Sequence, residues 1–518
     1  MSQEMTVEMA KKIIDESTDV AAKFIETNPA ISEMILKQLL KVDPEHFSGL
    51  QLLGLAKHRL GKNSEAVEIF QTSLELDPYN SDNFNNIGLA YGALGNHQRA
   101  IDNIKKAIEL DPEKHVFLNN LALQYRSSGD HKSAISTLEN ALKFFPNSAQ
   151  MWTNLGGLYG EIKQIQKSLE CFEEALKHDP CCSAAHIDTA FAYHLLEEWE
   201  NGFDYYEWRI EHFDQMKFYK KAYDQSKRWN GVDSLEGKTI LVYAEQGLGD
   251  CIQFIRFIPE LKERGCKVIV HCPLSLNALI KRCKGVDETT TKDIVNDNDE
   301  QFPEYDYQCC SMSLPYLLRS FNYSGKPYIE PVTPLFKEFI EKEYGKESMK
   351  IGIVWAGSPA HPHDKTRSIP LKHFNCIYET EGVKLFSLQF DTRPRKYGFD
   401  MRPGSDGNIV DYSEGCENMK LIDLTTMIQS MEDTCTILSG LDLLICCDTS
   451  IAHLAGAMGV PCWMCIPFNP DWRWGLHKDT TIWYDSIKIF RQTEKGDWDG
   501  VFKNVKKELD ETLLQNKR

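Results

Sequence analysis

Five prolines at a constant spacing constrain the fold of the first third of the chain more than any other feature. Each lies 34 residues after the one before it: Pro44, Pro78, Pro112, Pro146 and Pro180. Proline ends a helix because it lacks a backbone N–H and its ring clashes with the preceding turn. Apolar residues between the prolines follow helical spacing, which glycine interrupts at Gly61, Gly95 and Gly129. The period therefore predicts stacked repeats of two antiparallel helices each.

Other positions keep the same 34-residue period. A tyrosine recurs at Tyr91, Tyr125, Tyr159 and Tyr193, and small residues that allow close helix contact recur at Gly54, Gly88, Ala122 and Gly156. This pattern closely resembles the tetratricopeptide repeat. The resemblance implies an α-solenoid with about four full repeats over 44–180. We expect N-terminal helices with a degenerate repeat over 1–43, and capping helices that complete an array over 44–213.

Three asparagines, Asn86, Asn120 and Asn154, share one position of this period. Each precedes a core position on the first helix of its repeat, so the three amides are predicted to form a ladder along the groove of the array. A carboxamide donates and accepts hydrogen bonds at once, and it can bind the backbone of an extended peptide whatever its sequence. The alternative is that asparagine is simply common at this position of such repeats.

Composition argues against several classes of partner. The 518 residues carry a formal net charge of −18, which disfavours a nucleic acid or an anionic membrane. No apolar run reaches the roughly 20 residues that cross a membrane. The 16 cysteines are scattered or adjacent, and no secretory segment opens the chain, so we expect reduced thiols and a cytoplasmic location. Cys462 and Cys465 have redox spacing, but they lie within a predicted strand, which favours core packing.

Periodicity changes after the polar stretch 214–237, which we interpret as a linker. Apolar runs of strand length alternate with helical patterns at 238–244, 267–272, 349–355, 383–389, 441–447 and 460–466. Strands that alternate with helices build parallel sheets covered by helices. Two blocks of this pattern predict two Rossmann-like α/β domains, 238–335 and 336–518. A last helix near 498–514 is expected to pack back across the hinge between them.

The segment 441–461 is the most informative part of the second half. A buried strand ends in Asp448, Thr449 and Ser450, three residues that favour a helix N-terminus, and a helix of small residues follows. A helix N-terminus at the carboxyl end of a parallel strand presents free N–H groups and partial positive charge, which suit a phosphate. His453, one turn into the helix, could face the same anion. The alternative is an ordinary βαβ unit, which this pattern alone also fits.

Two segments resemble the heptosyltransferase-like glycosyltransferases, a GT-B family that acts on nucleotide-diphosphate sugars. The stretch from Asp448 to Pro461 matches the family signature D-[TS]-[GS]-x-x-H-x-A-x-A-x-G-x-P, although heptosyltransferases themselves usually have glycine where this chain has Ser450. The glycine-Asp turn at 247–250 is similar to the opening of that family. It lacks the third glycine of a dinucleotide fingerprint, which disfavours a nicotinamide enzyme. The resemblance covers about 238–490, with the acceptor side in the first α/β domain and the nucleotide sugar in the second.

The resemblance also implies roles for individual residues. Asp250 matches the position of the catalytic base, which removes the proton of the acceptor hydroxyl; its alternative role is to cap the helix that follows. A departing diphosphate needs preorganised donors, which the Thr449–Ile451 amides, His453 and a basic residue would supply. That basic residue is Lys365 or Arg367, and the pattern does not distinguish the two.

Further donor-site candidates come from turns and strand ends: Gly247, Gly249, Gln389, Asp448, Thr449, Ser450, Ile451 and Arg473. Gln389 could contact the nucleotide base or ribose, or cap the turn after its strand. Arg473, between two tryptophans, could bind phosphate or serve packing. The triplet 297–299, Asp-Asn-Asp, has the form of a metal-dependent transferase motif, but its acidic, loop-like surroundings are typical of a solvated charge run. The GT-B resemblance implies that no metal and no cofactor are required.

Together these patterns predict a cytoplasmic, metal-independent, inverting glycosyltransferase whose repeats recruit a protein acceptor. One alternative is a repeat scaffold with an inactive transferase-like half, against which the presence of both Asp250 and His453 argues. The other is a transferase for lipid-linked or small saccharide acceptors, against which the asparagine ladder argues.

Overall fold

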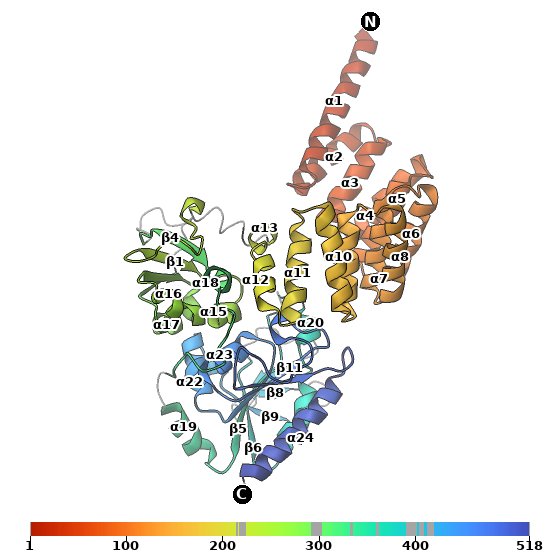
Figure 1. Ribbon diagram of the computed structural model, residues 1–518. Helices are drawn as coiled ribbons and strands as arrows, with labels where there is room; N and C mark the ends of the chain where they lie inside the picture. The colour runs from red at the N-terminus through yellow and green to blue at the C-terminus, as the bar shows by residue number, and fades with distance from the viewer. Residues whose placement is uncertain are drawn as a thin grey trace. The chain divides into compact units, whose positions relative to one another are not determined.

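The computed structural model describes residues 2–213, 216, 224–291, 303–331, 335–358, 361, 363–389, 401–403, 409–411 and 419–516. The chain divides into two compact units, Met1–Thr189 and Ala190–Arg518, which are coloured from red to yellow and from yellow to blue in Figure 1. The division falls within helix α11 (Ser183–Leu195), so the first part of this helix belongs to the first unit, and its last part and the helices that follow it belong to the second. Among the described helices, none has the length and apolar character needed to span a bilayer.

The first unit is a stack of antiparallel helix pairs, as the 34-residue period predicts. Its helices are α1 (Ser2–Phe24), α2 (Pro29–Val42), α3 (Phe47–Arg59), α4 (Asn63–Leu76), α5 (Ser81–Ala93), α6 (His97–Leu110), α7 (His115–Ser127), α8 (His131–Phe144), α9 (Ala149–Glu161), α10 (Ile165–His178) and the first part of α11. The prolines of the series lie in the turns after the second helices. Gly61, Gly95 and Gly129 end first helices with φ angles of 74°, 77° and 86°, a left-handed conformation that glycine adopts without strain. Lys163 takes the same conformation after α9, with a φ of 59°.

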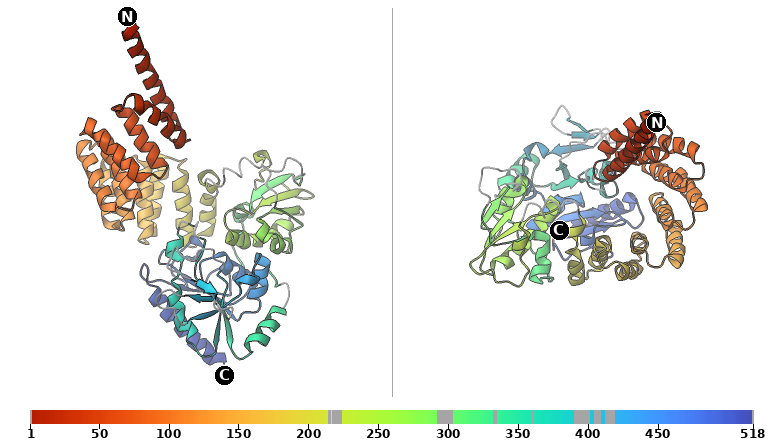
Figure 2. Two further views of the ribbon diagram at one scale, coloured as in Figure 1. Left: turned by 180° about the vertical axis from the view of Figure 1, so that it is seen from behind. Right: turned by 90° about the horizontal axis from the view of Figure 1, so that it is seen from above.

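Small residues let the two helices of a pair approach closely. A Cβ built on Gly54 would lie 2.5 Å from the ring of Phe70, and one built on Gly156 would lie 2.5 Å from the ring of Phe172. Ala122 is fully buried at the equivalent position. The first helices of successive pairs, from α3 to α9, contact one another directly, which places them along the inner side of the arc seen in Figure 2.

The second unit begins with short helices that lead into a sheet. In the described part of the chain this sheet has four parallel strands in the order β3-β2-β1-β4. Its elements are α12 (Trp199–Tyr206), α13 (Arg209–His212), β1 (Thr239–Tyr243), α15 (Leu248–Phe254), α16 (Ile258–Lys262), β2 (Lys267–His271), α17 (Leu274–Lys281), β3 (Glu288–Thr290), β4 (Tyr307–Cys310), α18 (Leu314–Leu318) and α19 (Leu335–Tyr344).

A larger sheet follows in the same unit. Among the described residues its strand order is β12-β11-β10-β5-β6-β9-β8-β7, parallel from β12 to β9 and antiparallel from β9 to β7. Its elements are β5 (Met349–Val354), α20 (Asp364–Arg367), α21 (Asn375–Tyr378), β6 (Val383–Ser387), β7 (Met401–Pro403), β8 (Ile409–Asp411), β9 (Lys420–Asp423), α22 (Met431–Leu438), β10 (Leu443–Cys447), α23 (Ser450–Met458), β11 (Cys462–Ile466), the 3-10 helix η6 (Trp472–Trp474), β12 (Ile487–Arg491) and α24 (Trp498–Asn516). Two parallel sheets confirm the predicted α/β class with two Rossmann-like domains. The hairpin β7–β8 extends the second sheet beyond the prediction.

The last helix, α24, packs on the second sheet. Trp498, Phe502 and Leu509 on this helix share one buried core with Phe374 and with Trp463 of β11. The helix is coloured dark blue in Figure 1. The prediction that it packs back across the hinge is therefore wrong, because its apolar face already matches the helix-facing side of its own sheet.

Candidate functional site

Helix α23 begins at the carboxyl end of β10, a strand that lies between β5 and β11 in the second sheet. Thr449 is the N-cap of this helix, but its side chain makes no cap hydrogen bond. The Thr449 hydroxyl is buried and has no hydrogen-bond partner among the described residues. An unsatisfied buried polar group costs about 1–3 kcal/mol. Since most such groups are satisfied in native proteins, this hydroxyl is an exception that a partner from outside the described residues would satisfy.

Helix α20 brings Arg367 to the same strand end. Its Nη1 donates to the backbone oxygen of Asp448 at 3.1 Å, and its guanidinium covers Gly357, where a Cβ would collide with it. The Nε of Arg367 is buried and has no hydrogen-bond partner in the described part of the chain; the nearest carboxylate oxygen, on Asp364, lies 3.6 Å away. Lys365 on the same helix is exposed. Of the two cations that the sequence left open, Arg367 is the one at the Asp448 end of β10.

The Asp448 carboxyl lies in surroundings that favour its protonated form. Burial, and after it the neighbouring carboxylate of Asp471, raises the pKa of Asp448 to about 6, although the charge of Arg367 opposes the shift. Asp448 can therefore change its charge within the physiological range.

The turn from β1 into α15 places Asp250 beside its own helix end. Gly247 is the N-cap, and its backbone N–H donates to Asp250 Oδ2 at 2.8 Å. Asp250 thus caps α15 from the third helical position, which is the alternative role that the sequence allowed. Gly249 faces α23, where a Cβ would lie 2.8 Å from Cδ2 of His453 and 3.3 Å from Cα of Ser450. Glycine at this position lets the N-terminal ends of α15 and α23 touch.

Arg473, in the loop after β11, joins this loop to α15. Its guanidinium donates to a carboxylate oxygen of Asp250, to Asp471 Oδ1 at 2.8 Å and to Gln253 Oε1 at 2.7 Å. It also stacks over the ring of Trp472 at 4.1 Å from the centroid. Burial disfavours the charged guanidinium, but the carboxylates of Asp471 and Asp250 outweigh burial and raise the pKa of Arg473. The residue stays charged and fixes Asp250 to the second sheet's loop.

The protonation of Asp250 reflects two opposing effects. Burial raises the pKa of Asp250, while the charge of Arg473 and the hydrogen bond from Gly247 lower it; the net shift is upward. The side chain is still 17% exposed, so a substrate hydroxyl could reach it. A carboxylate whose pKa moves towards the working pH becomes a more effective general base.

His453 is buried against neighbouring aromatic rings instead of lying open at the start of α23. Its Nδ1 lies 2.9 Å from the hydroxyl of Tyr484, and its ring centroid lies 5.3 Å from that of Trp474. Burial, and after it the charges of Arg473 and Arg256, lowers the pKa of His453 well below its ordinary value. The imidazole is therefore neutral and can offer a hydrogen bond but not a positive charge.

Gln389 follows β6 and caps the turn after β5. Its Oε1 accepts from the backbone N–H groups of Trp355 at 3.0 Å and Ala356 at 2.8 Å, and its Nε2 donates to the oxygen of Ala356 at 3.1 Å. Gln389 thus caps the turn after the neighbouring strand β5 instead of the turn after its own strand, and contact with a nucleotide stays a prediction.

The asparagine ladder of the first unit has a second column. Asn120 Nδ2 donates to Oδ1 of Asn85 in the preceding repeat at 2.9 Å, and Asn154 Nδ2 donates to Oδ1 of Asn119 at 2.6 Å. Asn86, like Asn120 and Asn154, is partly exposed on a first helix. The amides thus link consecutive repeats while they line the inner side of the array.

Sequence reasoning missed the aromatic side chains beneath Arg473. The ring of His194 packs against that of Trp472 with centroids 4.4 Å apart, and Trp199 meets Trp483 edge-on at 5.1 Å. Both ring nitrogens of His194 are buried and lack hydrogen-bond partners among the described residues. No motif connects these positions, and only the density of tryptophans in the two segments could have indicated them.

The triplet 297–299 lies outside the described residues. Among those that are described, no group of three His, Cys, Asp or Glu side chains is arranged to hold a metal ion. The predicted donor-site residues Ser450 and Ile451 are the first two residues of α23.

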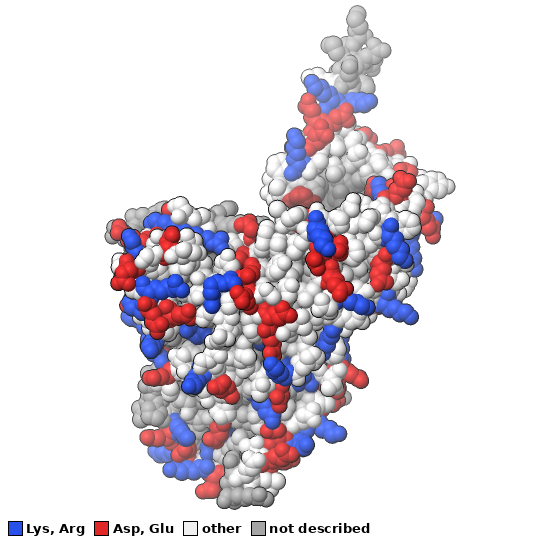
Figure 3. Space-filling view, viewed as in Figure 1, with Lys and Arg blue, Asp and Glu red and all other residues white. Residues whose placement is uncertain are grey.

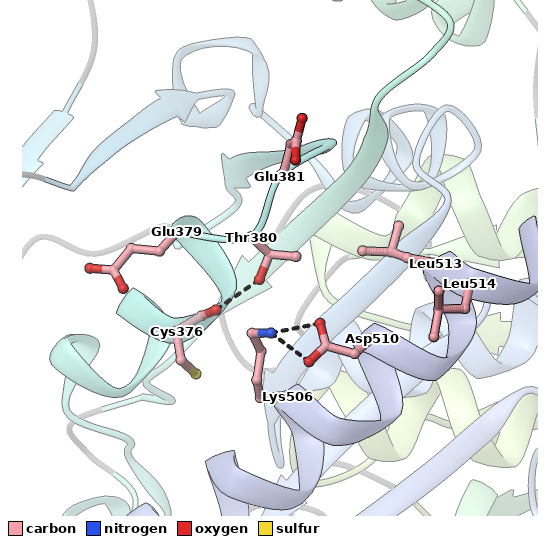
Figure 4. A pocket seen from close by; sticks show the side chains of 8 residues that line it. All are labelled: Cys376, Glu379, Thr380, Glu381, Lys506, Asp510, Leu513 and Leu514. Atoms are coloured by element: carbon pink, nitrogen blue, oxygen red, sulfur yellow. Dashed lines mark hydrogen bonds and ion pairs between the residues drawn. The ribbon is translucent and has the colours of Figure 1, made fainter. Parts of the chain in front are cut away.

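A separate pocket lies between α21 and α24 (Figure 4). Its lining residues are Cys376, Glu379, Thr380, Glu381, Lys506, Asp510, Leu513 and Leu514. The Nζ of Lys506 donates to both carboxylate oxygens of Asp510 at 2.6 Å, and the hydroxyl of Thr380 donates to the backbone of Cys376 at 2.9 Å. The pocket shares no residue with the predicted site.

Charges on the surface are mixed. On the face that Figure 3 shows, acidic and basic side chains are interspersed, and no broad basic patch is visible among the residues drawn in colour.

Comparison with known proteins identifies the repeats. Residues 48–80, 82–114 and 149–180 match the tetratricopeptide repeat. The N-terminal part of the chain contains tetratricopeptide repeats. A curated relative, Protein FlbA of Caulobacter vibrioides, is 22% identical over 302 residues, which cover 54% of this chain and 47% of FlbA. The chain therefore spans about half the length of this relative.

Solved structures are also similar over part of the chain. TTC0263, a tetratricopeptide-repeat protein of Thermus thermophilus, shares 19% identity and covers 35% of this chain and 98% of its own, with a TM-score of 0.32. PilF of Pseudomonas aeruginosa shares 14% identity and covers 41% of this chain and 98% of its own, with a TM-score of 0.34.

Proposed function

We propose that the chain is a metal-independent, inverting glycosyltransferase that uses a nucleotide-diphosphate sugar and recruits a protein acceptor through its repeats. The buried, unpartnered hydroxyl of Thr449 at the N-terminus of α23 carries this proposal. A helix N-terminus already favours an anion. The Thr449 hydroxyl beside it can donate one more hydrogen bond, because no described residue accepts from it. A diphosphate oxygen would satisfy it.

Arg367 supplies the positive charge that a departing diphosphate requires. Its Nε is the second buried donor at the end of β10 without a hydrogen-bond partner among the described residues, and its Nη1 is held by the Asp448 backbone. Donors fixed before the reaction stabilise charge that develops in the transition state without reorganising. The Thr449–Ile451 amides, Ser450 included, and the neutral imidazole of His453 would contribute hydrogen bonds to the same group.

Asp250 is the proposed base. Its raised pKa and partial exposure fit the removal of a proton from an acceptor hydroxyl, and each of its oxygens keeps a second lone pair beyond the bonds to Gly247 and Arg473. Gly249 brings this turn against α23, and Gly247 holds Asp250 at the start of α15, so base and donor site would be adjacent.

A transfer assay with a panel of nucleotide sugars tests the function. Asp250→Asn should lower kcat by about 10²–10⁴-fold while the donor Kd stays nearly unchanged, because a base acts on the rate and not on donor binding. Activity should survive EDTA. Near-normal turnover of the variant would leave Asp250 as a helix cap, and loss of activity with EDTA followed by rescue with Mn²⁺ would support a metal site at 297–299.

A further inference from the structure

Hydrogen bonds between asparagine side chains run along the groove of the repeat array. Asn120 and Asn154 each give one amide hydrogen to the preceding repeat, as described above, and both side chains are partly exposed on first helices. Two of the oxygens each receive one long bond of 3.4 Å: Asn86 Oδ1 from Asn85 Nδ2, and Asn154 Oδ1 from Gln150 Nε2. Each of the three oxygens therefore keeps at least one lone pair, to which a backbone N–H group of an extended peptide can donate.

The next rung of the same column is an aspartate. Asp188 lies on α11, 34 residues after Asn154, so the amide of the first three rungs is replaced by a carboxylate in the fourth. Asp188 is partly exposed, and its carboxylate makes no hydrogen bond or ion pair with another described residue. Burial raises the pKa of Asp188 to about 6, with a smaller opposing effect from Arg126. At pH 7.5 this position carries a negative charge that makes no ion pair with another described residue.

The nearest basic side chain is already paired. Arg126 on α7 donates from Nε to Glu161 Oε1 at 2.7 Å, and the other oxygen of Glu161 lies 2.8 Å from Nε2 of His131. Arg126 passes over Gly157, a residue of α9 that leaves space along the inner side of the array. Arg126 is thus ion-paired with Glu161, and a positively charged group on a bound ligand would be the partner of Asp188.

We propose that the groove binds an extended segment of the acceptor protein with a lysine or arginine placed opposite Asp188. Acceptor oxygens on Asn86, Asn120 and Asn154 bind the segment's backbone whatever its sequence, and the fourth rung selects a basic side chain. The proposal rests on the proposed function only in calling the bound segment an acceptor. The binding of the peptide itself is measured without a nucleotide sugar and without glycosyl transfer.

Fluorescence anisotropy with the full chain tests this selection at pH 7.5. The probes are two short dye-labelled peptides of serine and glycine with blocked ends, one with a central lysine and one with a central alanine. The lysine peptide should bind about twofold to fivefold more tightly, the effect of one charge pair near the protein surface. Asp188→Asn should reduce its affinity to that of the alanine peptide, and Asp188→Lys should instead favour a peptide with a central glutamate.

Glu170→Gln is the matched control, since it removes one exposed carboxylate from α10, on a second helix of the same unit. It should leave the preference for lysine unchanged. Equal binding of the two peptides, equal losses in Asp188→Asn and Glu170→Gln, or no binding of either peptide at millimolar concentration would each overturn the proposal. Selective peptide binding without transfer from any donor would instead overturn the proposed function and leave this groove assignment in place.

Discussion

Replacement of Arg473 by methionine should destabilise the second unit strongly. The guanidinium is 7% exposed and satisfies Asp250, which is 17% exposed, and Asp471, which is 34% exposed. Arg473→Met keeps most of the packing on Trp472 but leaves both carboxylates without their cation. Breaking a buried ion pair in this way costs roughly 3–5 kcal/mol, and the partial exposure of Asp471 places the expected loss near the lower limit, about 3 kcal/mol.

Urea unfolding followed by tryptophan fluorescence measures this loss, because Trp472, Trp474 and Trp483 lie in the second unit beside Arg473. A double-mutant cycle with Asp250→Asn should give a coupling energy of about 1.5–3 kcal/mol, since the second substitution removes the carboxylate that the first leaves unpaired. Without Arg473 the folded-state pKa of Asp250 rises further, so stability is lost as pH rises through that pKa, and the defect should be smaller at pH 5 than at pH 8. A loss below about 1 kcal/mol, or additive single losses, would refute this account of Arg473.

Three further changes test other parts of the structure. Lys163→Gly should stabilise the first unit by about 1 kcal/mol in urea unfolding, because it relieves a left-handed conformation that Gly61, Gly95 and Gly129 adopt freely; a loss of stability would contradict this. The pKa of Asp448 is about 6, so the folded protein keeps a proton at pH 5 that the unfolded chain has lost, and wild-type stability falls as pH rises from 4 through 6. Asp448→Asn removes this pH dependence. Between pH 4 and pH 7.5 its free energy of unfolding should therefore rise by on the order of 2 kcal/mol relative to that of wild type. Parallel pH profiles of the two proteins would disprove this prediction. His453→Ala should weaken nucleotide-sugar binding by about 1–3 kcal/mol in calorimetry, and unchanged affinity in a folded variant would remove His453 from the donor site.

Regular features of the fold could be predicted from the sequence because local physics decides them. Proline ends helices wherever it stands, so the five prolines in register determine the repeat length. Apolar runs of strand length predicted β1, β2, β5, β6, β10 and β11 within a few residues. The hairpin β7–β8 was missed because its strands are three residues long, too short to show a period of two.

Parts of the candidate site depend on tertiary contacts that a sequence does not display. Asp250 and Arg473 are 223 residues apart, and nothing local to either residue indicates their pairing. His453 has the spacing of an anion ligand, but Gly249, Trp474 and Tyr484 enclose it. The choice between Lys365 and Arg367 required the orientation of a four-residue helix, α20.

Binding of a nucleotide-diphosphate sugar to the full chain is the most direct test of the central claim. Isothermal titration with UDP-, ADP-, GDP- and CMP-linked sugars should reveal saturable binding of at least one of them. Thr449→Val should weaken this binding about fivefold to a hundredfold, the range for a lost hydrogen bond to a charged group, while Thr449→Ser, which keeps the hydroxyl, should bind nearly as wild type does. If none of these nucleotide sugars binds, or if Thr449→Val binds as tightly as wild type, the assignment of this site to a diphosphate is contradicted.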